Sequence, residues 1–441
     1  MEIKKKIENY FDRLFPIARS ITGKGYQESL NIISDIIPLK KINFKTGEKC
    51  FDWTVPKEWN VEEAYVIDPD GNKILDFKEN NLYLMGYSVS IQKSLTLDKL
   101  KKKLYTIKEL PKAIPYVTSY YKRDWGFCIS YNQFKKLKKG IYKVVIKSTL
   151  TSGKLTIGIA DIKGISKKTI FFSTYLCHPS MAHNELSGPL VTAFLYQRLK
   201  KLKKLNYSIK FLFCPENIGS VAFLKKFGDE LEKNIVAGYV INCVGFGKSF
   251  FYKKSRKENS LTNIIALDYL KKQKYPYKII DFFAAGSDEK QFSTPGFDLP
   301  IGLLMGQMYG TYKEYHTSLD NKDIISFDIM LKIINSYENI VKKINQIPTF
   351  LNEKYISRIL KGSPQLSKSK TNLYPETMNI NSYNINKKLN NEVRSILEIL
   401  NLSDGSNTLF EIAYKRNISL KNIFSSAKKL IKTKYIKKYK K

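Results

Sequence analysis

Beyond residue 165 the chain alternates short apolar runs with longer amphipathic segments, and this pattern constrains the fold more than any other feature. The apolar runs are "KTIFFSTYL" at 168–176, "YSIKFLFCP" at 207–215 and "IVAGYVINCV" at 235–244. Segments with helical spacing, such as "GPLVTAFLYQRLKKL" at 188–202, separate them. Strands that alternate with helices predict an α/β fold with a mostly parallel sheet covered on both faces. In such sheets binding and catalytic residues gather on loops at the carboxyl ends of the strands.

The rest of the chain has different residue patterns from this alternating region. Residues 1–38 have apolar positions at helical spacing, whereas 45–150 carry short aromatic and β-branched runs with hairpin signals at Asp70-Gly71 and Ser152-Gly153. The polar stretch that follows residue 346 is typical of a linker, and the short helical patterns after it fit a small helix-turn-helix or winged-helix module. We therefore expect N-terminal helices of the core (1–45), an inserted mainly-β domain (46–148), the α/β core (149–346), a linker (347–387) and the C-terminal module (388–441).

The formal net charge of +35 does not by itself indicate a nucleic-acid-binding protein. Only 8 of the 75 basic residues are arginine, which is the residue favoured for bidentate contacts with phosphates and bases. A lysine excess spread along the whole chain is typical of solvated surfaces. We therefore expect no sequence-specific DNA binding.

The N-terminal segment and the cysteine spacing bear on the cellular compartment. No apolar signal-peptide segment follows the start "MEIKKKIENYFDRLF", and no apolar run approaches the ~18 residues that span a bilayer. The five cysteines are scattered without CxxC spacing, which favours reduced thiols over disulfides or a cysteine-based zinc site. These patterns predict a cytoplasmic protein without a membrane partner.

Three histidines occur in the chain, and two of them occupy positions where chemistry is expected. His178 directly follows an apolar run, and Glu185 lies a short distance further on, before a Ser-Gly pair. Glu216 follows the next apolar run, and His316 lies among tyrosines in the polar loop "YGTYKEYHTSLD". Imidazole and carboxylate groups at one sheet edge are typical of the metal site of a hydrolase.

Several short motifs are informative as an ordered set. In the core they are "NELSG" at 184–188, "PENIGS" at 215–220, "GSDEKQFSTPGFDLP" at 286–300 and "YHTSLD" at 315–320. Elsewhere they are "RSITGKG" at 19–25, "FDWTVPKEWN" at 51–60, "IPYVTSYYKRDWGFC" at 114–128 and "SDG" at 403–405. Together they resemble the M28 zinc-aminopeptidase superfamily, and more closely the bacterial group described as having an aminopeptidase-like domain. The resemblance implies a zinc-exopeptidase-like core, an inserted β-rich domain of the DUF2172/DUF4910 type and a C-terminal winged helix-turn-helix domain.

The resemblance also shows where this chain departs from the two-zinc enzymes. Asn184 stands at the place of the bridging Asp, Asn217 at that of a Glu ligand and Asn242 at that of the later Asp. Neutral amides bind zinc far more weakly than carboxylates, so we expect one zinc ion or none. His183 lies outside the matched positions, and we interpret it as a loop residue without a ligand role.

The implied site has one zinc ion held by His178, Glu185 and His316, with an open position for water. Glu216 matches the general base of the family, and Asp288 would either orient a histidine or supply a further ligand. An acidic residue at a helix start is also favoured by the helix macrodipole, so a purely structural role for Glu185 stays open.

These observations predict a zinc-dependent, aminopeptidase-like hydrolase that cleaves an amide or peptide bond. The group it resembles is found beside genes of surface-polysaccharide biosynthesis, which implies an amide on an amino-sugar precursor as an alternative to a small peptide. Two other functions stay open, a catalytically inactive ligand-binding descendant of the fold and a nucleic-acid-binding regulator acting through the C-terminal module. We expect that module to dock on the core or on a partner protein. The sequence leaves association into a homo-oligomer open.

Overall fold

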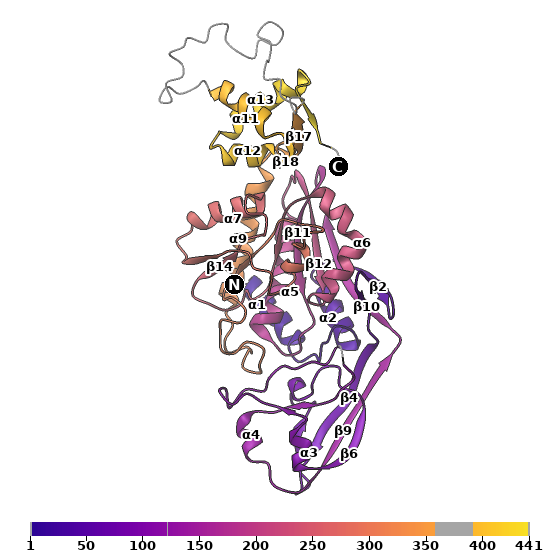
Figure 1. Cartoon of the computed structure of the whole chain (residues 1–441). Coiled ribbons are helices and arrows are strands. Elements are labelled where there is room, and N and C mark those ends of the chain that lie inside the picture. Colours follow the sequence, from indigo (N-terminus) through magenta and orange to yellow (C-terminus); the bar gives the residue numbers. More distant parts are fainter. Residues whose placement is uncertain (1, 121, 358–390, 440–441) are drawn as a thin grey trace.

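The centre of the protein is one eight-stranded sheet in the order β1-β10-β12-β11-β13-β16-β14-β15 (Figure 1). The structure is a computed structural model, and it describes residues 2–120, 122–357 and 391–439. β11 is parallel to β12 and β13, and β13 is parallel to β16, whereas β10 and β14 pair antiparallel with the neighbours that join them to this parallel centre. The predicted mostly parallel α/β sheet is thereby confirmed. The strands are β1 (Lys40–Lys45), β10 (Lys154–Ile162), β11 (Ser166–Tyr175), β12 (Tyr207–Cys214), β13 (Ile235–Val240), β14 (Phe250–Lys253), β15 (Tyr277–Ile280) and β16 (Ile301–Met305).

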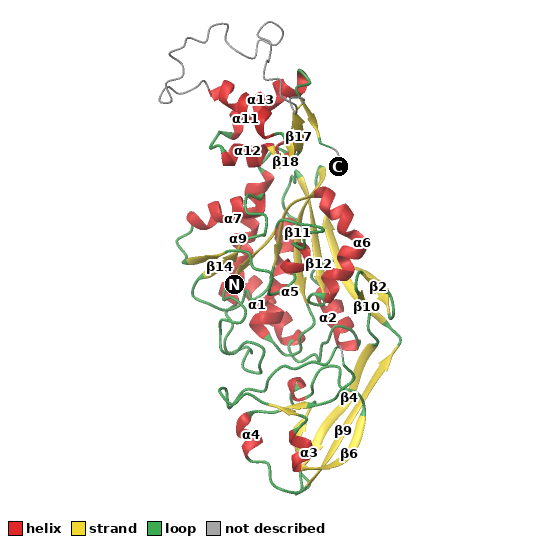
Figure 2. Ribbon diagram, in the orientation of Figure 1, coloured by secondary structure: helices red, strands yellow, loops and turns green. Residues whose placement is uncertain are grey.

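Helices cover both faces of this sheet, and the alternation of side chains along β11 explains why (Figure 2). Ile170 and Phe172 lie in one apolar core, whereas Phe171 between them lies in a second core on the opposite face. The first core also contains buried residues of α1 (Glu2–Leu14), α2 (Lys24–Ser34), α5 (Ser187–Leu199), α7 (Leu261–Lys271) and α9 (Phe327–Asn345), and the second contains those of α6 (Ile218–Asn234) and α8 (Glu289–Phe292).

The helix α5 is buried on nearly all sides, which matches a sequence that is apolar at most positions. At its start, a Cβ on Gly188 would lie 2.5 Å from the carbonyl oxygen of Ile241 and 2.7 Å from the Thr174 hydroxyl. The helix therefore approaches the sheet as closely as it does because residue 188 is glycine. This close approach brings the turn before α5 next to the carboxyl end of β11.

The segment between the N-terminal helices and the core forms a second, four-stranded sheet in the order β5-β4-β9-β6. The predicted hairpin at Asp70-Gly71 joins β4 and β5, with the Asp68 carboxylate accepting hydrogen bonds from the backbone N–H groups of Asp70 and Asn72. The strands are β4 (Glu58–Ile67), β5 (Lys73–Asp76), β6 (Ile91–Thr96) and β9 (Ile141–Thr151). Smaller elements of this segment are β2 (Lys49–Cys50), β3 (Trp53–Thr54), η1 (Asn81–Tyr83), α3 (Leu97–Lys101), β7 (Leu104–Tyr105), β8 (Phe127–Cys128) and α4 (Tyr131–Lys135).

The second predicted hairpin, at Ser152-Gly153, is wrong. β9 pairs with β4 and β6 in the small sheet, whereas β10 pairs with β1 and β12 in the large one. Both edges of β9 are therefore already paired, so β10 cannot pair with β9 to form a hairpin. The turn instead carries the chain from one sheet into the other, and the backbone groups of Gly153 bond to Thr46.

In its described residues, the C-terminal part combines a three-stranded sheet with three helices. β17 (Lys354–Ser357) pairs antiparallel with β18 (Asp404–Thr408) and β19 (Ile436–Lys438). The helices are α11 (Asn391–Leu402), α12 (Leu409–Lys415) and α13 (Leu420–Lys432). The expected linker at 347–387 begins too early, because the 3₁₀ turn η3 (Thr349–Asn352) and β17 lie inside it. The remainder of that expected linker, 358–387, lies outside the described residues.

The three parts follow one another along an elongated molecule (Figure 1). The C-terminal helices lie at one end, the four-stranded sheet at the other, and the eight-stranded sheet between them. No helix within the described ranges is long and apolar enough to cross a membrane.

Candidate active site

His178 lies just after β11, and its two ring nitrogens have different surroundings. Its Nδ1 is 2.8 Å from Oε2 of Glu185, and the other carboxylate oxygen of Glu185 accepts a hydrogen bond from the backbone N–H of Cys177. Glu185 comes from a single π-helical turn, η2 (Ala182–Leu186), which leads directly into α5. Both oxygens of this buried carboxylate are thus engaged, which fixes the orientation of the imidazole and leaves its Nε2 for another partner.

Glu216 and His316 lie on the open side of that imidazole. Nε2 of His178 is 3.7 Å from Oε2 of Glu216, which follows β12, and the centres of the His178 and His316 rings are 5.3 Å apart. Two imidazoles on one tetrahedral zinc ion, with Zn–N distances of about 2.0–2.1 Å, would have ring centres about 5 Å apart. The structure therefore brings together four of the five predicted site residues, and the two histidines are spaced as ligands of one ion would be.

The pKa values of His316 and Glu216 suit a metal site with a general base, whereas the raised pKa of His178 favours the protonated imidazole, which does not bind a metal ion. Burial lowers the pKa of His316 to about 3, with a smaller contribution from His178, so its imidazole is neutral. Burial alone would lower the pKa of His178, but the Glu185 carboxylate more than offsets this and the pKa is raised. Burial raises the pKa of Glu216, although the charge of His178 opposes it. Neutral imidazole is the form that ligates metal ions, and a carboxylate with a raised pKa is a better proton acceptor.

Left-handed backbone conformations are concentrated around the site. His316 has φ 54°, Asn217 φ 57°, Cys243 φ 51° and Ser180 φ 48°. Non-glycine residues rarely adopt such values and need support from their surroundings. All four lie on the loops that follow strands of the large sheet. Strained backbone conformations are therefore concentrated at the edge of the sheet where the candidate site lies.

The three amides that the resemblance predicts at carboxylate positions are also at this edge. Asn184 donates a hydrogen bond to the hydroxyl of Tyr175, but its buried Oδ1 has no protein partner in the described chain. Both polar atoms of the Asn242 side chain are likewise buried without a partner among the described residues. Asn217 differs, because its Oδ1 accepts a hydrogen bond from Gln291. Buried polar atoms of this kind normally bond to a ligand, an ion or an ordered water molecule.

Asp288 supports the loop that carries Glu216. Its Oδ1 accepts hydrogen bonds from the backbone N–H of Asn217, at 2.6 Å, and from the hydroxyl of Ser220, at 3.0 Å. Burial, followed by the charge of Glu216, raises its pKa to about 8. These contacts are with the Glu216 loop and not with His178 or His316, whereas the sequence predicted that Asp288 would orient a histidine or supply a further metal ligand.

His183 is buried on the π-helical turn, whereas the sequence predicted a loop position. Its Nδ1 accepts a hydrogen bond from the backbone N–H of Gly245, and its Nε2 donates one to the carbonyl of Gln307. Burial lowers its pKa to about 3, so the ring is neutral. Because both ring nitrogens are already bonded, the imidazole has no free lone pair for a metal ion.

The four-stranded sheet segment supplies one wall of the site through Tyr116. The ring of Tyr116 lies 4.9 Å from that of His178 and 5.5 Å from that of His316, measured between ring centres. The backbone N–H of Tyr116 donates to the carbonyl of His316, and Pro115 and Thr317 form an isolated β-bridge beside it. The chain far upstream in the sequence therefore holds the loop of His316 in place.

A second group of ligating atoms adjoins the first. Sγ of Cys177, Nδ1 of His178 and a carboxylate oxygen of Glu185 all lie within 4.8 Å of one another. All three residues are buried, and burial raises the pKa of the Cys177 thiol well above its ordinary value. Zinc binds the thiolate and a catalytic zinc ion needs an open position for water, so this group fits a catalytic ion less well than His178 Nε2 and His316.

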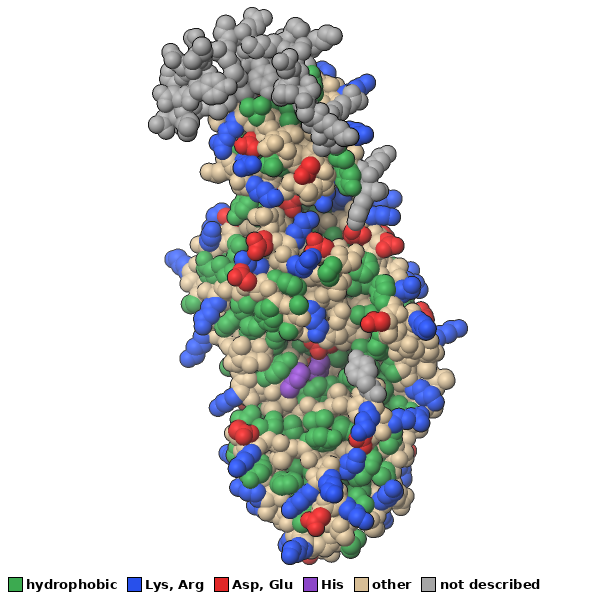
Figure 3. Space-filling model, viewed as in Figure 1, with side chains coloured by type: hydrophobic (Ala, Val, Ile, Leu, Met, Phe, Trp, Pro, Cys, Tyr) green, Lys and Arg blue, Asp and Glu red, His purple; other side chains and the backbone are tan. Residues whose placement is uncertain are grey.

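The site is accessible from outside the protein. Histidine side chains are visible on the face drawn in Figure 3, in the middle third of the molecule, with acidic surface directly beside them. The side chain of Glu216 is 22% exposed, whereas that of Glu185 is fully enclosed. A small molecule can therefore reach Glu216 without displacing Glu185.

Comparison with known proteins agrees with this architecture. A family model described as a domain of unknown function, DUF4910, matches residues 8–347, and one described as a winged helix-turn-helix matches residues 354–438. The chain belongs to the DUF4910 family. Over 432 residues it is 41% identical to a protein of Clostridium acetobutylicum, covering 98% of this chain and 96% of that one. The relative is provisionally named as a polysaccharide biosynthesis protein with an aminopeptidase-like domain.

Solved structures extend the comparison from the DUF4910 family to zinc aminopeptidases. A crystal structure from Clostridium acetobutylicum, provisionally named as a peptidase, is 39% identical and superposes with a TM-score of 0.77, covering 99% of this chain and 97% of that one. A zinc aminopeptidase from Bacillus subtilis shares 12% identity with a TM-score of 0.54, over 77% of this chain and 95% of that one. An M28 peptidase precursor from Shewanella amazonensis gives 11% identity and a TM-score of 0.52, over 77% and 96% of the two chains. The resemblance to M28 aminopeptidases is thereby confirmed as a likeness of fold.

Three residues near the site of this DUF4910 protein were not predicted from the sequence. They are Arg19, Tyr116 and Asp320. Each lies inside one of the motifs that carry the resemblance, in "RSITGKG", "IPYVTSYYKRDWGFC" and "YHTSLD" respectively. Membership of those motifs was a signal for them, although nothing in the local pattern gave their contacts.

Proposed function

We propose that this protein is a zinc-dependent hydrolase that cleaves an amide or peptide bond. The observation that carries the proposal is the arrangement of His178, whose Nδ1 is held by Glu185 while Nε2 faces Glu216 beside His316. Carboxylate–histidine–zinc arrangements of this kind are general among zinc sites. The aminopeptidase-like fold also supports a hydrolase, but it does not identify the substrate.

His178, through Nε2, and His316 would hold the ion. The partnerless amide oxygens of Asn184 and Asn242 at the same sheet edge would be available as neutral metal ligands. When bound, zinc lowers the pKa of a water molecule and polarises a carbonyl oxygen. The contacts of Glu185 favour an orienting role over the ligand role expected from the sequence. One ion suits this donor set, because neutral amides offset the charge of two adjacent ions poorly.

Glu216 would act as the general base. Its carboxylate oxygen lies on the Nε2 side of His178, is reachable from solvent and has a pKa raised by burial. It would accept the proton of the attacking water and return it to the leaving nitrogen as the amide bond breaks. The substrate would be a small peptide or another small amide, and the name of the Clostridium relative supports an amide of a polysaccharide precursor as one candidate.

The three amides that replace metal-binding carboxylates favour a second candidate function, binding of a ligand without catalysis. Asn184, Asn217 and Asn242 stand where the two-zinc enzymes carry carboxylates, so loss of the metal would leave a pocket that still binds the ancestral ligand class.

Metal analysis and one substitution separate the two candidates. Protein purified without chelator should contain about one zinc per chain, and chelator-treated protein should regain hydrolysis of a peptide or amide library when zinc is added. Glu216→Gln should keep the fold and the metal but lower hydrolysis by about 10²-fold or more, because general-base catalysis contributes on that order. Protein that binds no zinc under any of these conditions would support the non-catalytic candidate, and wild-type turnover in Glu216→Gln would place the base elsewhere.

A further inference from the structure

Arg19 is a buried cation whose hydrogen bonding is incomplete. Its side chain is 2% exposed, and it lies between α1 and α2 in the motif "RSITGKG". Its Nε donates to the carbonyl of His178 at 3.1 Å, and one terminal nitrogen donates to the carbonyl of Leu14 at the end of α1. The other terminal nitrogen is buried without a partner among the described residues. Burial lowers the pKa of Arg19 only to about 10, so the group is positively charged at neutral pH.

An unsatisfied guanidinium nitrogen in this position is costly unless something binds it. Leaving a buried charged donor without an acceptor costs more than leaving a neutral one, and native proteins normally pair such groups. In the described parts of the chain, both acceptors of Arg19 are neutral backbone carbonyls. Glu185 favours the charged form of Arg19 through space, but its two oxygens are already bonded to Cys177 and His178.

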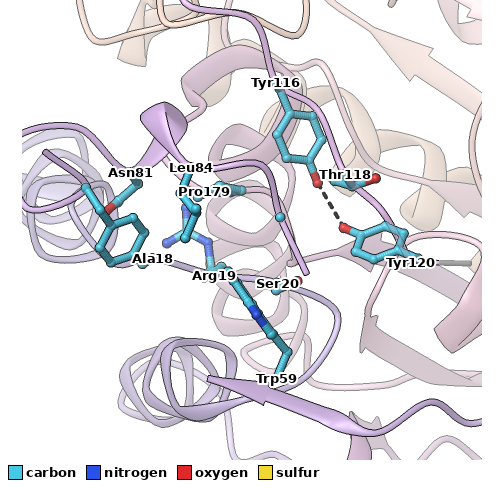
Figure 4. A pocket seen from close by; sticks show the side chains of 12 residues that line it. Ala18, Arg19, Ser20, Trp59, Asn81, Leu84, Tyr116, Thr118, Tyr120 and Pro179 are labelled. Atoms are coloured by element: carbon cyan, nitrogen blue, oxygen red, sulfur yellow. Dashed lines mark hydrogen bonds between the residues drawn. The ribbon is translucent and has the colours of Figure 1, made fainter. Parts of the chain in front are cut away.

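Arg19 lines a pocket, and several of the other walls come from the four-stranded sheet segment (Figure 4). Trp59 lies on one side, and on another lie Tyr116 and Tyr120, whose hydroxyls are hydrogen-bonded to each other. Thr118 also lines the pocket and supplies a hydroxyl. The open volume is about 20 Å³, which is room for one small polar group and not for a whole sugar or side chain.

The pocket and the proposed catalytic site share two structural members. Arg19 bonds the backbone of His178, and Tyr116 lies against the rings of both His178 and His316 while also lining the pocket. Pro179, the residue after His178, lines the pocket as well. The pocket therefore adjoins the segment that carries His178.

We propose that this pocket binds a carboxylate of the substrate on the free nitrogen of Arg19, so that the substrate is a small amide carrying a carboxylate near the cleaved bond. A carboxylate fits because it is small, negatively charged and an acceptor only, which matches a single cationic donor flanked by hydroxyl groups. Anchoring the substrate at such a point would position its amide for attack. The substrate class rests on the proposed hydrolase function, whereas carboxylate binding itself does not.

Binding can be measured without catalysis, on metal-free protein, so that neither an ion nor turnover contributes. The probes are N-acetylglycine and its uncharged analogue N-acetylglycinamide, and the signal is the fluorescence of Trp59 in a background where Trp53 and Trp125 are replaced by Phe. N-acetylglycine should bind about tenfold or more tightly than the amide, because the charged acceptor forms the stronger hydrogen bond. This preference should disappear in Arg19→Met.

Two further variants keep the test decisive if Arg19→Met folds poorly. Ala18→Leu fills the pocket from its wall and keeps Arg19, so it should also abolish binding of N-acetylglycine. Arg13→Met removes an exposed arginine of α1 that pairs with Asp35, and it should leave binding unchanged. Equal affinity for the acid and the amide, unchanged binding in Ala18→Leu, or tighter binding of inorganic phosphate than of N-acetylglycine would overturn the proposal. Carboxylate binding with no hydrolysis of any amide would instead count against the proposed function alone.

Discussion

The two ring nitrogens of His178 have different partners, and the chemistry of the site depends on that difference. Nδ1 is tied to a fully enclosed carboxylate, whereas Nε2 faces the partly exposed Glu216. A hydrogen bond at one nitrogen fixes both the tautomer and the direction of the other. Glu185 would therefore set the metal affinity of the site without touching the ion.

Glu185→Gln tests this role at the scale of a single charge. The change keeps the size of the side chain but weakens the hydrogen bond to Nδ1, and such outer partners typically contribute 10–100-fold, so zinc affinity should fall by about 10-fold or more. Zinc binding would be measured by competition with a chromophoric chelator. Glu411→Gln is the matched control, since Glu411 is a buried glutamate of the C-terminal part whose capping role glutamine can fill. Equal zinc affinity in Glu185→Gln and wild type would show that Glu185 is structural only.

The raised pKa of Asp288 leads to a prediction about how the stability of the protein depends on pH. Its folded-state pKa of about 8 lies above the ordinary value of 3.8, so between these values the folded protein holds a proton that the unfolded chain has released. Rising pH therefore favours the unfolded state across this window, and the contribution of Asp288 to stability is lost between about pH 4 and pH 8. An asparagine at this position would resemble the protonated form of Asp288, because its amide oxygen can still accept from Asn217 and Ser220.

The Asp288→Asn variant should consequently lose part of this pH dependence. Denaturant midpoints of metal-free wild type and variant would be compared at pH 5 and pH 8. Wild type should lose more stability than Asp288→Asn on going from pH 5 to pH 8. Parallel losses in the two proteins would mean that Asp288 is ionised in the folded state at neutral pH.

The sequence predicted which residues meet at the site more accurately than it predicted the contacts between them. His178, Glu185 and Glu216 follow strands or precede a helix, and the topology of a parallel sheet brings such positions to one edge. Which ring nitrogen Glu185 would bond was not predictable, because that depends on the π-helical turn of η2, which has no local sequence signal. The pocket of Arg19 was also not predictable, since its walls come from segments far apart in the chain.

At the scale of elements, the turn η2 depends on Asp320. One carboxylate oxygen of Asp320 accepts from the backbone N–H of His183 at 2.6 Å, and the other accepts from that of Asn184 at 2.9 Å. The hydroxyl of Tyr312 donates to the second oxygen as well. Burial raises the pKa of Asp320 to about 6, so at pH 7.5 the group is mostly ionised and can accept from all these donors.

Asp320→Asn should destabilise the protein by about 1–3 kcal/mol, because an amide replaces one acceptor oxygen and leaves at least one buried donor unpaired. Denaturant unfolding at pH 7.5 measures this. The control is Asp298→Asn, which affects an ion pair with Arg256 in which both side chains are more than 40% exposed, and which should cost less than about 1 kcal/mol. Similar losses in the two variants would show that Asp320 does not hold the turn.

The elements that were predicted correctly are those with long, regular patterns. The parallel strands and their helices were readable because each has a repeating apolar face. The turn at Gly153 was misassigned because a hairpin and a strand that passes from one sheet to another share the same local signal, and only the partners of β4 and β1 distinguish them. The start of the C-terminal part was placed too late because the short strand β17 precedes the polar stretch and pairs only with distant residues.

At the scale of the whole molecule, the site lies where the large sheet meets the four-stranded sheet segment, and the C-terminal part lies at the opposite end (Figure 1). The winged-helix match therefore raises the question of whether that end reads DNA. In a winged helix, specificity comes from exposed side chains of the recognition helix, most often Arg, Asn or Gln. The corresponding helix here is α13, whose residues Ile423, Ala427 and Leu430 are buried.

The remaining face of α13 predicts weak sequence readout. Its exposed residues include Lys421, Lys428 and Lys432, whereas Asn422 is half-buried, and the helix contains no arginine. Phe424 packs its ring 4.6 Å from that of Phe350, so the helix is also anchored against the end of the core. Lysines bind phosphates as point charges, which gives attraction to nucleic acid without base specificity.

We therefore predict that DNA binding by the full-length protein is non-specific and decreases steeply with salt, as counterion release requires. Competition binding at about 150 mM salt would compare defined duplexes with random DNA, and replacing Lys421 and Lys432 by Ala should weaken binding to all of them alike, because phosphate contacts carry no sequence information. Specific regulators prefer their sites by about 10³-fold or more. A preference of that size for one duplex, lost selectively in Asn422→Ala, would make the C-terminal part a sequence reader and would favour the regulator over a docking role. If no duplex is preferred in this way, the basic face of α13 only adds positive charge to the surface. The function of the molecule then lies with His178 and its neighbours.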